Sequence, residues 1–492
     1  MTAEVRRDFL GDVKWLGLVQ VALRAKGLVV LPFLTRELGV LDYGVWSQLA
    51  IVTAFVGPFI SWGTTFGFLR RKSGKSLEER RRFFSAWIYA LFAAFALVFA
   101  IVMAVAAPLA GYLLRSPDQG TALIAFAVLY AFTGALLNAE INWLRVNGES
   151  RAHALSLLAQ AVLSLAAVVT YLIVGGSVLF LAALTVAADA LLVAGLYARH
   201  VGLLGWARAD YAAFWQAFRY GLPLMPMAFA DIGINWIDRL VLLKYVSIAE
   251  IGIYNLVHGM SLMIIQTVTQ PFWAYYPPRA TAYFNAGKTK ELRTLYGLSA
   301  GTLFAIQVPS AIGIFFVAPP FLAIMAPPEF AAGAAVLPLL FLGFAISRQG
   351  LYIQQVLEWH YRQHWVTISL YGCFALNVLF NFLLVPKLGL VGAGISNIAA
   401  FTARYIFIVA LIWDKSPVHA NVGFVVRILA GGAFMAVIMW LLPAAFDQFH
   451  SWGPVIQFLI SVAVGSAAYV TALGAFGVVQ PGRVFSFARR AI

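Results

Sequence analysis

Charged residues inside long apolar runs are the part of this sequence that could do chemistry. There are ten of them, in chain order Arg24, Lys26, Glu140, Asp189, Asp231, Asp238, Arg239, Arg348, Arg404 and Arg427. Inserting an ionised side chain near the centre of a membrane-spanning helix costs about 2.5–3.5 kcal/mol of free energy. Such a side chain must therefore be paired with an opposite charge, be hydrated or take part in function. Six of the ten are basic, and bases that outnumber acids at this depth favour an anionic ligand.

Four of the basic residues are candidates for a cationic, substrate-binding cavity: Arg24, Lys26, Arg348 and Arg404. Arginine suits a pyrophosphate because its planar guanidinium makes paired, charge-assisted hydrogen bonds. The alternative is that these bases pair with buried carboxylates as scaffolding only. Arg427 differs from them, because it lies near the end of its apolar run and can extend to lipid headgroups.

The acidic residues are candidates for gating or coupling. Asp231 is the first, because it lies at the same depth in its run as Arg24 and could pair with it in one state. Glu140 is the second candidate, and Asp238 is also included. Asp231, Asn235 and Asp238 follow each other at i, i+4 and i+7, so they share one helix face.

Polar faces of this kind recur in other apolar runs. We predict that these faces line a shared hydrated cavity. The polar residues expected to line it are Asn235, Asn142, Tyr352, Gln355, Asn397 and His258. His258 is also explained as a packed polar residue. Asn138, Asn377 and Asn381 are equally well explained as hydrogen-bonding contacts between helices.

The elements that must position these residues are membrane-spanning helices. The chain has 492 residues, of which 62% are hydrophobic and 11% charged, against about 25% charged in soluble domains. A hydrocarbon core of ~30 Å needs ~20 apolar residues to cross it. Fourteen segments meet this length, namely 14–34, 44–69, 83–109, 121–144, 153–174, 177–198, 221–243, 251–276, 295–317, 332–357, 365–385, 390–413, 424–446 and 453–478.

The basic residues orient these segments. Of the 34 lysines and arginines, 24 fall in the termini and alternate loops, whereas the opposite loops hold Arg36, Arg115, Lys244 and Lys387. This bias predicts a multi-pass protein of the bacterial inner membrane with both termini in the cytoplasm. The net charge of +14 is therefore assigned to anionic lipid headgroups rather than to nucleic acid.

The chain also repeats itself. LTRELGVLDYGVW around Gly44 matches LLKYVSIAEIGIY around Gly252, and RAH at 151–153 matches RQH at 362–364, at offsets of 208 and 211 residues. Six spans per half give both halves the same orientation, a parallel repeat. We predict an N-terminal six-helix lobe (1–198), an amphipathic cytoplasmic linker (199–220), a C-terminal six-helix lobe (221–414) and a two-helix hairpin with a cytoplasmic tail (415–492).

An ATP-driven or hydrolytic role has no residues to carry it in this sequence. We find no Walker loop, no serine–histidine pattern and no paired-cysteine metal site, and the single cysteine, Cys373, lies inside an apolar run. The external loops are short and could not hold a folded catalytic domain. We therefore expect no enzyme activity, no cofactor and no metal centre.

Two stretches carry a resemblance to a known family. LTRELGVLDYGVWSQLAIVTAFVGPFISWGTTFGFLRR, together with DRLVLLKYVSIAEIGIYNLVHGMSLM in the second half, resembles the Wzx-type oligosaccharide flippases of the multidrug/oligosaccharidyl-lipid/polysaccharide exporter superfamily. The resemblance implies two six-helix lobes around a central cavity. It implies alternating access that moves a polyprenyl-pyrophosphate-linked oligosaccharide from the cytoplasmic to the periplasmic leaflet, for O-antigen, capsule or exopolysaccharide. It also implies that basic residues line the cavity, a role that Arg24, Lys26, Arg348 and Arg404 could fill.

The expected partners follow from this resemblance. They are the lipid-linked glycan, membrane lipids, a coupling ion (Na⁺ or H⁺) and glycan polymerase or assembly proteins, with no nucleic acid. Three alternatives stay open: a cation-coupled multidrug or small-molecule exporter of the same superfamily, a peptidoglycan-precursor flippase, and a membrane-embedded enzyme or scaffold of glycan synthesis. Arg24 and Lys26 in the first span disfavour a cationic drug as the substrate.

Overall fold

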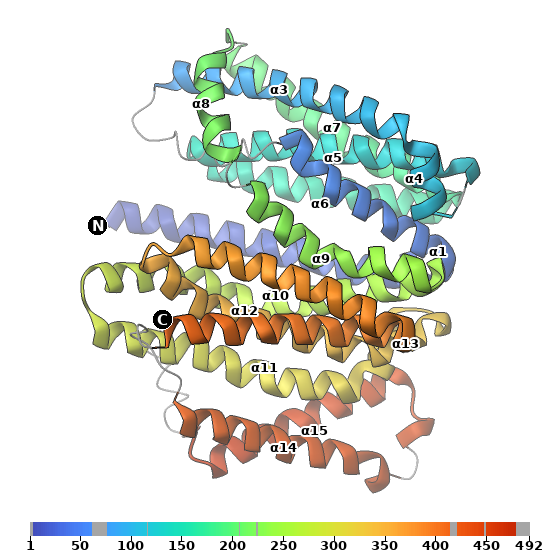
Figure 1. The fold of residues 1–492 in the computed structure, drawn as a ribbon, viewed down its shortest axis with the longest axis vertical. Coiled ribbons are helices and arrows are strands. Elements are labelled where there is room, and N and C mark those ends of the chain that lie inside the picture. The colour runs from blue at the N-terminus through green and yellow to red at the C-terminus, as the bar shows by residue number, and fades with distance from the viewer. Residues whose placement is uncertain are drawn as a thin grey trace. The chain divides into compact units, whose positions relative to one another are not determined.

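A computed structural model describes most of the chain. It covers the backbone of residues 3–61, 76–115, 117–205, 207–222, 225–413, 421–446 and 449–478, and within these ranges it leaves the side chains of 3–26, 28, 29, 117, 118, 150, 203, 204 and 450 undescribed. The described elements are all helical (Figure 1). They form two compact units, Met1–Trp236 with Ser247–Gly252, and Ile237–Val246 with Ile253–Ile492.

The first unit is a helix bundle. Its helices are α1 (Ala3–Ser61), α3 (Leu77–Ala104), α4 (Ala106–Leu113), α5 (Pro117–Val146), α6 (Ser150–Val174), α7 (Val178–Leu204) and α8 (Tyr211–Gly221), with the first half of α9 (Met225–Tyr245). Helix α5 packs against α1, α3, α4, α6 and α7, so it lies at the centre of this unit. Figure 1 shows α3, α5, α6 and α7 running alongside one another.

The second unit contains the rest of α9 and, from Ile253 onward, the helices that follow it. These are α10 (Ile248–Asn285), α11 (Thr289–Met325), η2 (Pro328–Ala335), α12 (Leu337–Trp359), α13 (Gln363–Ile412), α14 (Val422–Ala445), η3 (Phe449–Ser451) and α15 (Pro454–Ala475). Helix α12 packs on α11 and α13. The α14–α15 hairpin packs on α11, where the Tyr469 hydroxyl donates a hydrogen bond to the Ala305 carbonyl at 2.9 Å.

Two helices bend sharply at a glycine. Gly39 in α1 has φ 65° and Gly389 in α13 has φ 54°, values at which the regular helix is interrupted. Only glycine adopts such a conformation without a steric penalty from Cβ. Each bend lies between two of the apolar segments found in the sequence, 14–34 and 44–69 in α1, and 365–385 and 390–413 in α13. Each of these helices therefore includes residues from two of the predicted spans.

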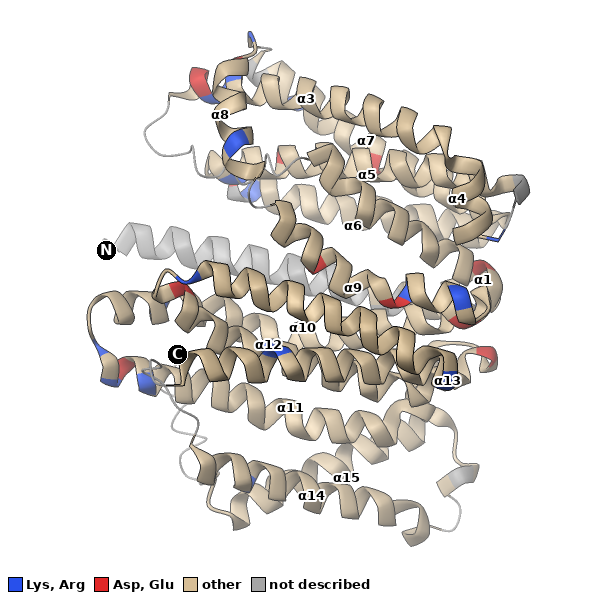
Figure 2. Ribbon diagram, in the orientation of Figure 1, with Lys and Arg blue, Asp and Glu red and all other residues tan. Residues whose placement is uncertain are grey.

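The prediction of an all-α, multi-pass membrane protein is confirmed. Ten described helices are long and apolar enough to cross a membrane, or eleven if the bent pair η2–α12 counts as one span. Fourteen spans were predicted because hydropathy divides α1 and α13 at their bends, and because the prediction included α9, which carries Asp231, Asp238 and Arg239. Figure 2 shows most of the described charged residues near helix ends, with few along the middles of helices. The lobe boundaries and a cavity between lobes stay predictions.

The segment predicted as an amphipathic linker is helical over much of its length. Asp210 caps α8 by accepting a hydrogen bond from the Ala213 amide at 2.9 Å. One face of α8 buries Ala213 and Ala217, while Tyr211 and Trp215 are exposed. The buried face packs against α3. Small residues inward and aromatic residues outward are typical of a helix that lies in the headgroup layer.

Candidate functional site

Asp238 is a buried carboxylate at the centre of a hydrogen-bond network in the second unit. The Tyr254 hydroxyl and the Asn397 amide donate to Asp238 Oδ2 at 2.6 and 2.7 Å. The Asn381 amide donates to Asp238 Oδ1 at 3.0 Å. Each of the four side chains is at most 2% exposed. The network joins α9, α10 and both halves of α13 through one negative charge and three neutral donors.

The bend in α13 makes this arrangement possible. Asn377 and Asn381 lie one turn apart before Gly389, and Asn397 lies after it. The Asn377 amide donates to Asn397 Oδ1 at 3.4 Å, and the Asn381 amide donates to Asn377 Oδ1 at 2.9 Å. The two halves come so close that a Cβ on Gly392 would lie 2.6 Å from the Leu384 carbonyl oxygen. The asparagines therefore make interhelical contacts and also hold Asp238.

A positive charge lies next to this network. Arg239 is 3% exposed, and its Nε donates a hydrogen bond to Asn255 Oδ1. Its guanidinium lies 5.6 Å from the centre of the Tyr254 ring. His258, one turn beyond Tyr254, is buried and packs edge-on against Phe344 at 5.0 Å. The site thus offers carboxylate and amide oxygens, which are ligands for a hard cation, and a carboxylate that can accept a proton.

The predicted basic residues are placed only in part. Arg404 is half-buried on α13 and donates from Nη2 to Gln354 Oε1 at 2.6 Å and from Nε to Ser369 Oγ at 3.3 Å. Arg348 is half-buried on α12. Arg24 and Lys26 belong to α1, but their side chains lie outside the described residues. Whether the four form one cationic site stays a prediction.

Glu140 lies in the first unit with a partner that the sequence did not indicate. His200 Nδ1 is 3.2 Å from Glu140 Oε1, and the two side chains are 5% and 2% exposed. The His200 ring stacks on Phe84 at 4.8 Å and lies against Trp143 at 4.9 Å. This contact connects α5 to α7 inside an aromatic cluster.

The remaining candidates make local contacts. Asp231 is exposed, and its carbonyl accepts from the Asn235 amide at 2.7 Å. The Asn142 amide donates to Asn138 Oδ1 at 2.7 Å. Two candidates make contacts between helices of the second unit: the Tyr352 hydroxyl lies 3.0 Å from Ser299 Oγ, and the Gln355 amide donates to the Pro277 carbonyl at 3.3 Å.

The two repeat motifs meet each other in the first unit. A Cβ added to Gly252 would lie 2.9 Å from Gly44 Cα and 2.8 Å from the Val40 carbonyl oxygen. A Cβ added to Gly44 would collide with the Ile248 carbonyl. Gly44 and Gly252 are the residues that the sequence repeat aligns. The absence of a side chain at both positions lets the two backbones touch.

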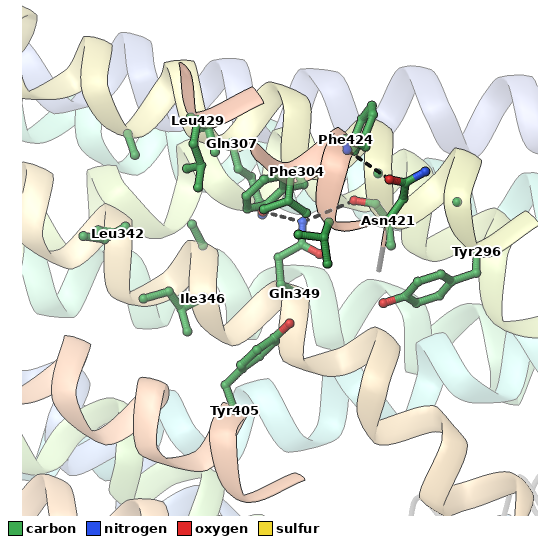
Figure 3. A pocket seen from close by; sticks show the side chains of 18 of the residues that line it. Tyr296, Phe304, Gln307, Leu342, Ile346, Gln349, Tyr405, Asn421, Phe424 and Leu429 are labelled. Atoms are coloured by element: carbon green, nitrogen blue, oxygen red, sulfur yellow. Dashed lines mark hydrogen bonds between the residues drawn. The ribbon is translucent and has the colours of Figure 1, made fainter. Parts of the chain in front are cut away.

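A cavity of about 950 Å³ lies within the second unit, between α11, α12, α13 and α14 (Figure 3). Most of its wall is apolar, with Phe304, Leu342 and Ile346 among the lining residues. Gln307 and Gln349 lie on its wall, where the Gln349 amide donates to Gln307 Oε1 at 2.8 Å. The sequence analysis did not single out either glutamine, although each is an isolated polar residue in an apolar run.

Comparisons with known proteins agree with this fold. Residues 33–330 match a family model described as polysaccharide biosynthesis protein. An uncharacterized membrane protein of Methanocaldococcus jannaschii is 23% identical over 266 residues, which are 53% of this chain and 50% of that protein. The chain thus spans about half the length of this curated relative.

Two kinds of solved structure share the fold. The lipid II flippase MurJ, in an inward closed conformation, matches with a TM-score of 0.73 at 13% identity, covering 94% of this chain and 98% of that one. An inward-facing multidrug resistance transporter of the MATE family, in the MOP superfamily, matches with a TM-score of 0.57 at 15% identity. The match covers 81% of this chain and 96% of that one. A mutant of the Vibrio cholerae MATE transporter VcmN matches with a TM-score of 0.54 at 16% identity. The match covers 84% of this chain and 98% of that one.

Proposed function

Because this chain belongs to the polysaccharide biosynthesis protein family, whose model matches residues 33–330, we propose that it is a lipid-linked oligosaccharide flippase. It moves a polyprenyl-pyrophosphate-linked oligosaccharide from the cytoplasmic to the periplasmic leaflet of the bacterial inner membrane, with both termini in the cytoplasm. Its product enters O-antigen, capsule or exopolysaccharide synthesis, where a glycan polymerase is the expected downstream partner. The family match is the observation that carries this proposal.

The positive charges within the apolar helices support an anionic substrate. In the proposal, Arg24, Lys26, Arg348 and Arg404 bind the pyrophosphate and sugars while the polyprenyl tail stays in lipid. The half-buried Arg404 bonds only to neutral groups in the two hydrogen bonds described for it, with Gln354 and Ser369. Such hydrogen bonds hold the planar guanidinium in a fixed orientation, which suits it to binding an anion.

The Asp238 network supports a coupling role for this residue. A carboxylate that three neutral donors hold between three helices can exchange a donor for Na⁺ or take up a proton. Either event would change how α9, α10 and α13 are held together. An ion drives transport only if it binds the two states with unequal affinity, so the proposal requires that this network differ between them. Asp231 and Glu140 remain gating candidates.

Transport in proteoliposomes tests the proposal. The purified protein is reconstituted with a fluorescent polyprenyl-pyrophosphate oligosaccharide, and the fraction reaching the opposite leaflet is measured with a membrane-impermeant quencher. We expect protein-dependent flipping that exceeds that of empty liposomes. Flipping no faster than in empty liposomes, under a Na⁺ gradient and under a proton gradient alike, would contradict the proposal.

A peptidoglycan-precursor flippase is the second candidate, favoured by the fold shared with a lipid II flippase along 94% of the chain. The same assay separates the two functions when lipid II replaces the oligosaccharide. Uptake of a dye-like cation in that assay would instead support the small-molecule exporter. The proposed function predicts that the polyprenyl-linked oligosaccharide is the preferred substrate of the three.

A further inference from the structure

Gln354 on α12 joins two charged side chains, Arg404 and Glu358, through hydrogen bonds. We propose that Gln354 is a positioning residue, which orients the Arg404 guanidinium for the pyrophosphate of the substrate and interposes a neutral group between the guanidinium and the Glu358 carboxylate. The inference rests on the proposed function, because it concerns how one of the assigned basic residues binds the substrate.

Two helical segments of the second unit hold the Arg404 guanidinium. Its Nη2 donates to Gln354 Oε1 on α12 at 2.6 Å, and its Nε donates to Ser369 Oγ, in the first half of α13, at 3.3 Å. The Ser369 hydroxyl donates its own proton to the Val366 carbonyl at 2.7 Å, so its oxygen acts toward Arg404 as an acceptor. Nε and Nη2 lie along the same edge of the rigid, planar guanidinium. The two acceptors therefore fix the plane of the group as well as its position.

The orientation of the Gln354 amide is set by its two neighbours. Its Nε2 donates to Glu358 Oε1, one turn further along α12, at 2.8 Å. An ionised carboxylate only accepts hydrogen bonds, and a guanidinium only donates them. The amide nitrogen must therefore face Glu358, and the amide oxygen must face Arg404. Glu358 thus holds Gln354 in the orientation that binds the arginine.

An amide at position 354 suits anion binding by Arg404 better than a carboxylate would. A carboxylate there would form a charge-assisted pair with Arg404, and this pair would compete with the pyrophosphate for the guanidinium. The Gln354 amide holds the guanidinium through a hydrogen bond and adds no negative charge. The negative charge of Glu358 reaches Arg404 only through this neutral amide in the chain of hydrogen bonds.

The same hydrogen bonds also join α12 to α13, which pack against each other. A purely structural Gln354 would need only to offer Arg404 an acceptor, and a glutamate offers one as well. A Gln354 that positions Arg404 for an anion must offer an acceptor without a charge. The two roles therefore differ in the charge that they tolerate at position 354.

Exchange of the two neighbouring side chains separates these roles. The double variant Gln354→Glu with Glu358→Gln keeps the net charge and allows both hydrogen bonds, but it places the carboxylate directly against Arg404. Binding of a fluorescent polyprenyl-pyrophosphate oligosaccharide is measured in detergent by fluorescence anisotropy, and flipping is measured against substrate concentration in proteoliposomes. We expect the dissociation constant and the KM to rise about ten-fold, while the maximal rate stays within about two-fold of the wild type. The melting temperature should not change.

Two single variants accompany the exchange. Gln354→Met removes the acceptor without adding a charge, and it covers the case in which the exchanged protein fails to fold. It should raise the dissociation constant by about five-fold, because Arg404 loses one of its two anchors. Thr367→Ala is the matched control on α13, since the Thr367 hydroxyl donates to the Gln363 carbonyl of its own helix. It should bind the substrate as the wild type does.

The outcomes distinguish this inference from the proposed function. Wild-type affinity in the exchange variant or in Gln354→Met would overturn the inference. A lower melting temperature or maximal rate at an unchanged KM would also overturn it, because Gln354 would then be purely structural. If the variants follow the expected order of affinities but the wild type flips no substrate, the proposed function fails while the positioning role stands.

Discussion

Gly252 lies in backbone contact with Gly44, the residue that the sequence repeat aligns with it. A Cβ on Gly252 would be 2.9 Å from Gly44 Cα, closer than real Cβ contacts allow. The equivalent positions of the two repeat motifs thus meet within the first unit.

Substitution of Gly252 by valine should therefore destabilise the described state. The added side chain would collide with the backbone at Gly44 and Val40, and overpacking of this kind costs about 1–3 kcal/mol. Thermal unfolding of the purified variant measures the loss. Gly259→Ala is the matched control, because Gly259 is on the same helix and has nothing within 4 Å of an added Cβ. Equal melting temperatures for Gly252→Val and the control would contradict the prediction.

Substitution of Asp238 by asparagine should uncouple transport while the protein stays folded. The change keeps the shape of the side chain but removes the charge that Tyr254, Asn381 and Asn397 surround. We expect the ion-gradient-driven flipping rate to fall by about ten-fold or more, the size of a typical coupling energy. Tyr254→Phe removes one donor without removing the charge and should have a smaller effect. An Asp238→Asn protein that still responds fully to Na⁺ and proton gradients would exclude Asp238 as the coupling residue.

The Glu140–His200 contact should contribute to stability whether or not it takes part in gating. His200→Ala removes the group that lies 3.2 Å from Glu140 Oε1 and the ring that packs on Phe84 and Trp143, and loss of a buried aromatic side chain costs about 3 kcal/mol. Glu140→Gln preserves the shape and should cost less, about 1 kcal/mol. Chemical unfolding compares the two variants. If Glu140→Gln is stable and flips substrate at the wild-type rate, Glu140 is scaffolding rather than a gate.

Arg427 should be dispensable, in contrast to the basic residues assigned to substrate. It lies in the second turn of α14, close to the predicted cytoplasmic end, where its side chain can extend to headgroups. Arg427→Ala is expected to retain flipping within about two-fold, since an exposed interfacial charge contributes little. If Arg427→Ala lowers the flipping rate as much as Arg404→Ala does at equal protein level, the assignment of Arg427 to the headgroups rather than to the substrate is wrong.

The sequence was sufficient for the fold class because hydropathy, charge bias and repeat spacing are local properties of the chain. The site was less predictable. Asp238 was a named candidate, but its partner Tyr254 looked like an ordinary aromatic residue of a span, and the Asn377–Asn397 contact depends on the bend at Gly389. His200 meets Glu140 across 60 residues, a contact that depends on helix rotation. Gln354 became meaningful only when the structure showed its amide joining Arg404 to Glu358.

The central claim is that basic side chains within the membrane hold an anionic, lipid-linked glycan during transport. The most direct measurement is the flipping rate of the fluorescent oligosaccharide lipid in proteoliposomes containing wild type, Arg24→Ala or Arg404→Ala at matched protein density. Loss of a charge-assisted hydrogen bond to pyrophosphate is worth about 1.5–3 kcal/mol, so each variant should flip at least about ten-fold more slowly. Wild-type rates for both variants would contradict the account.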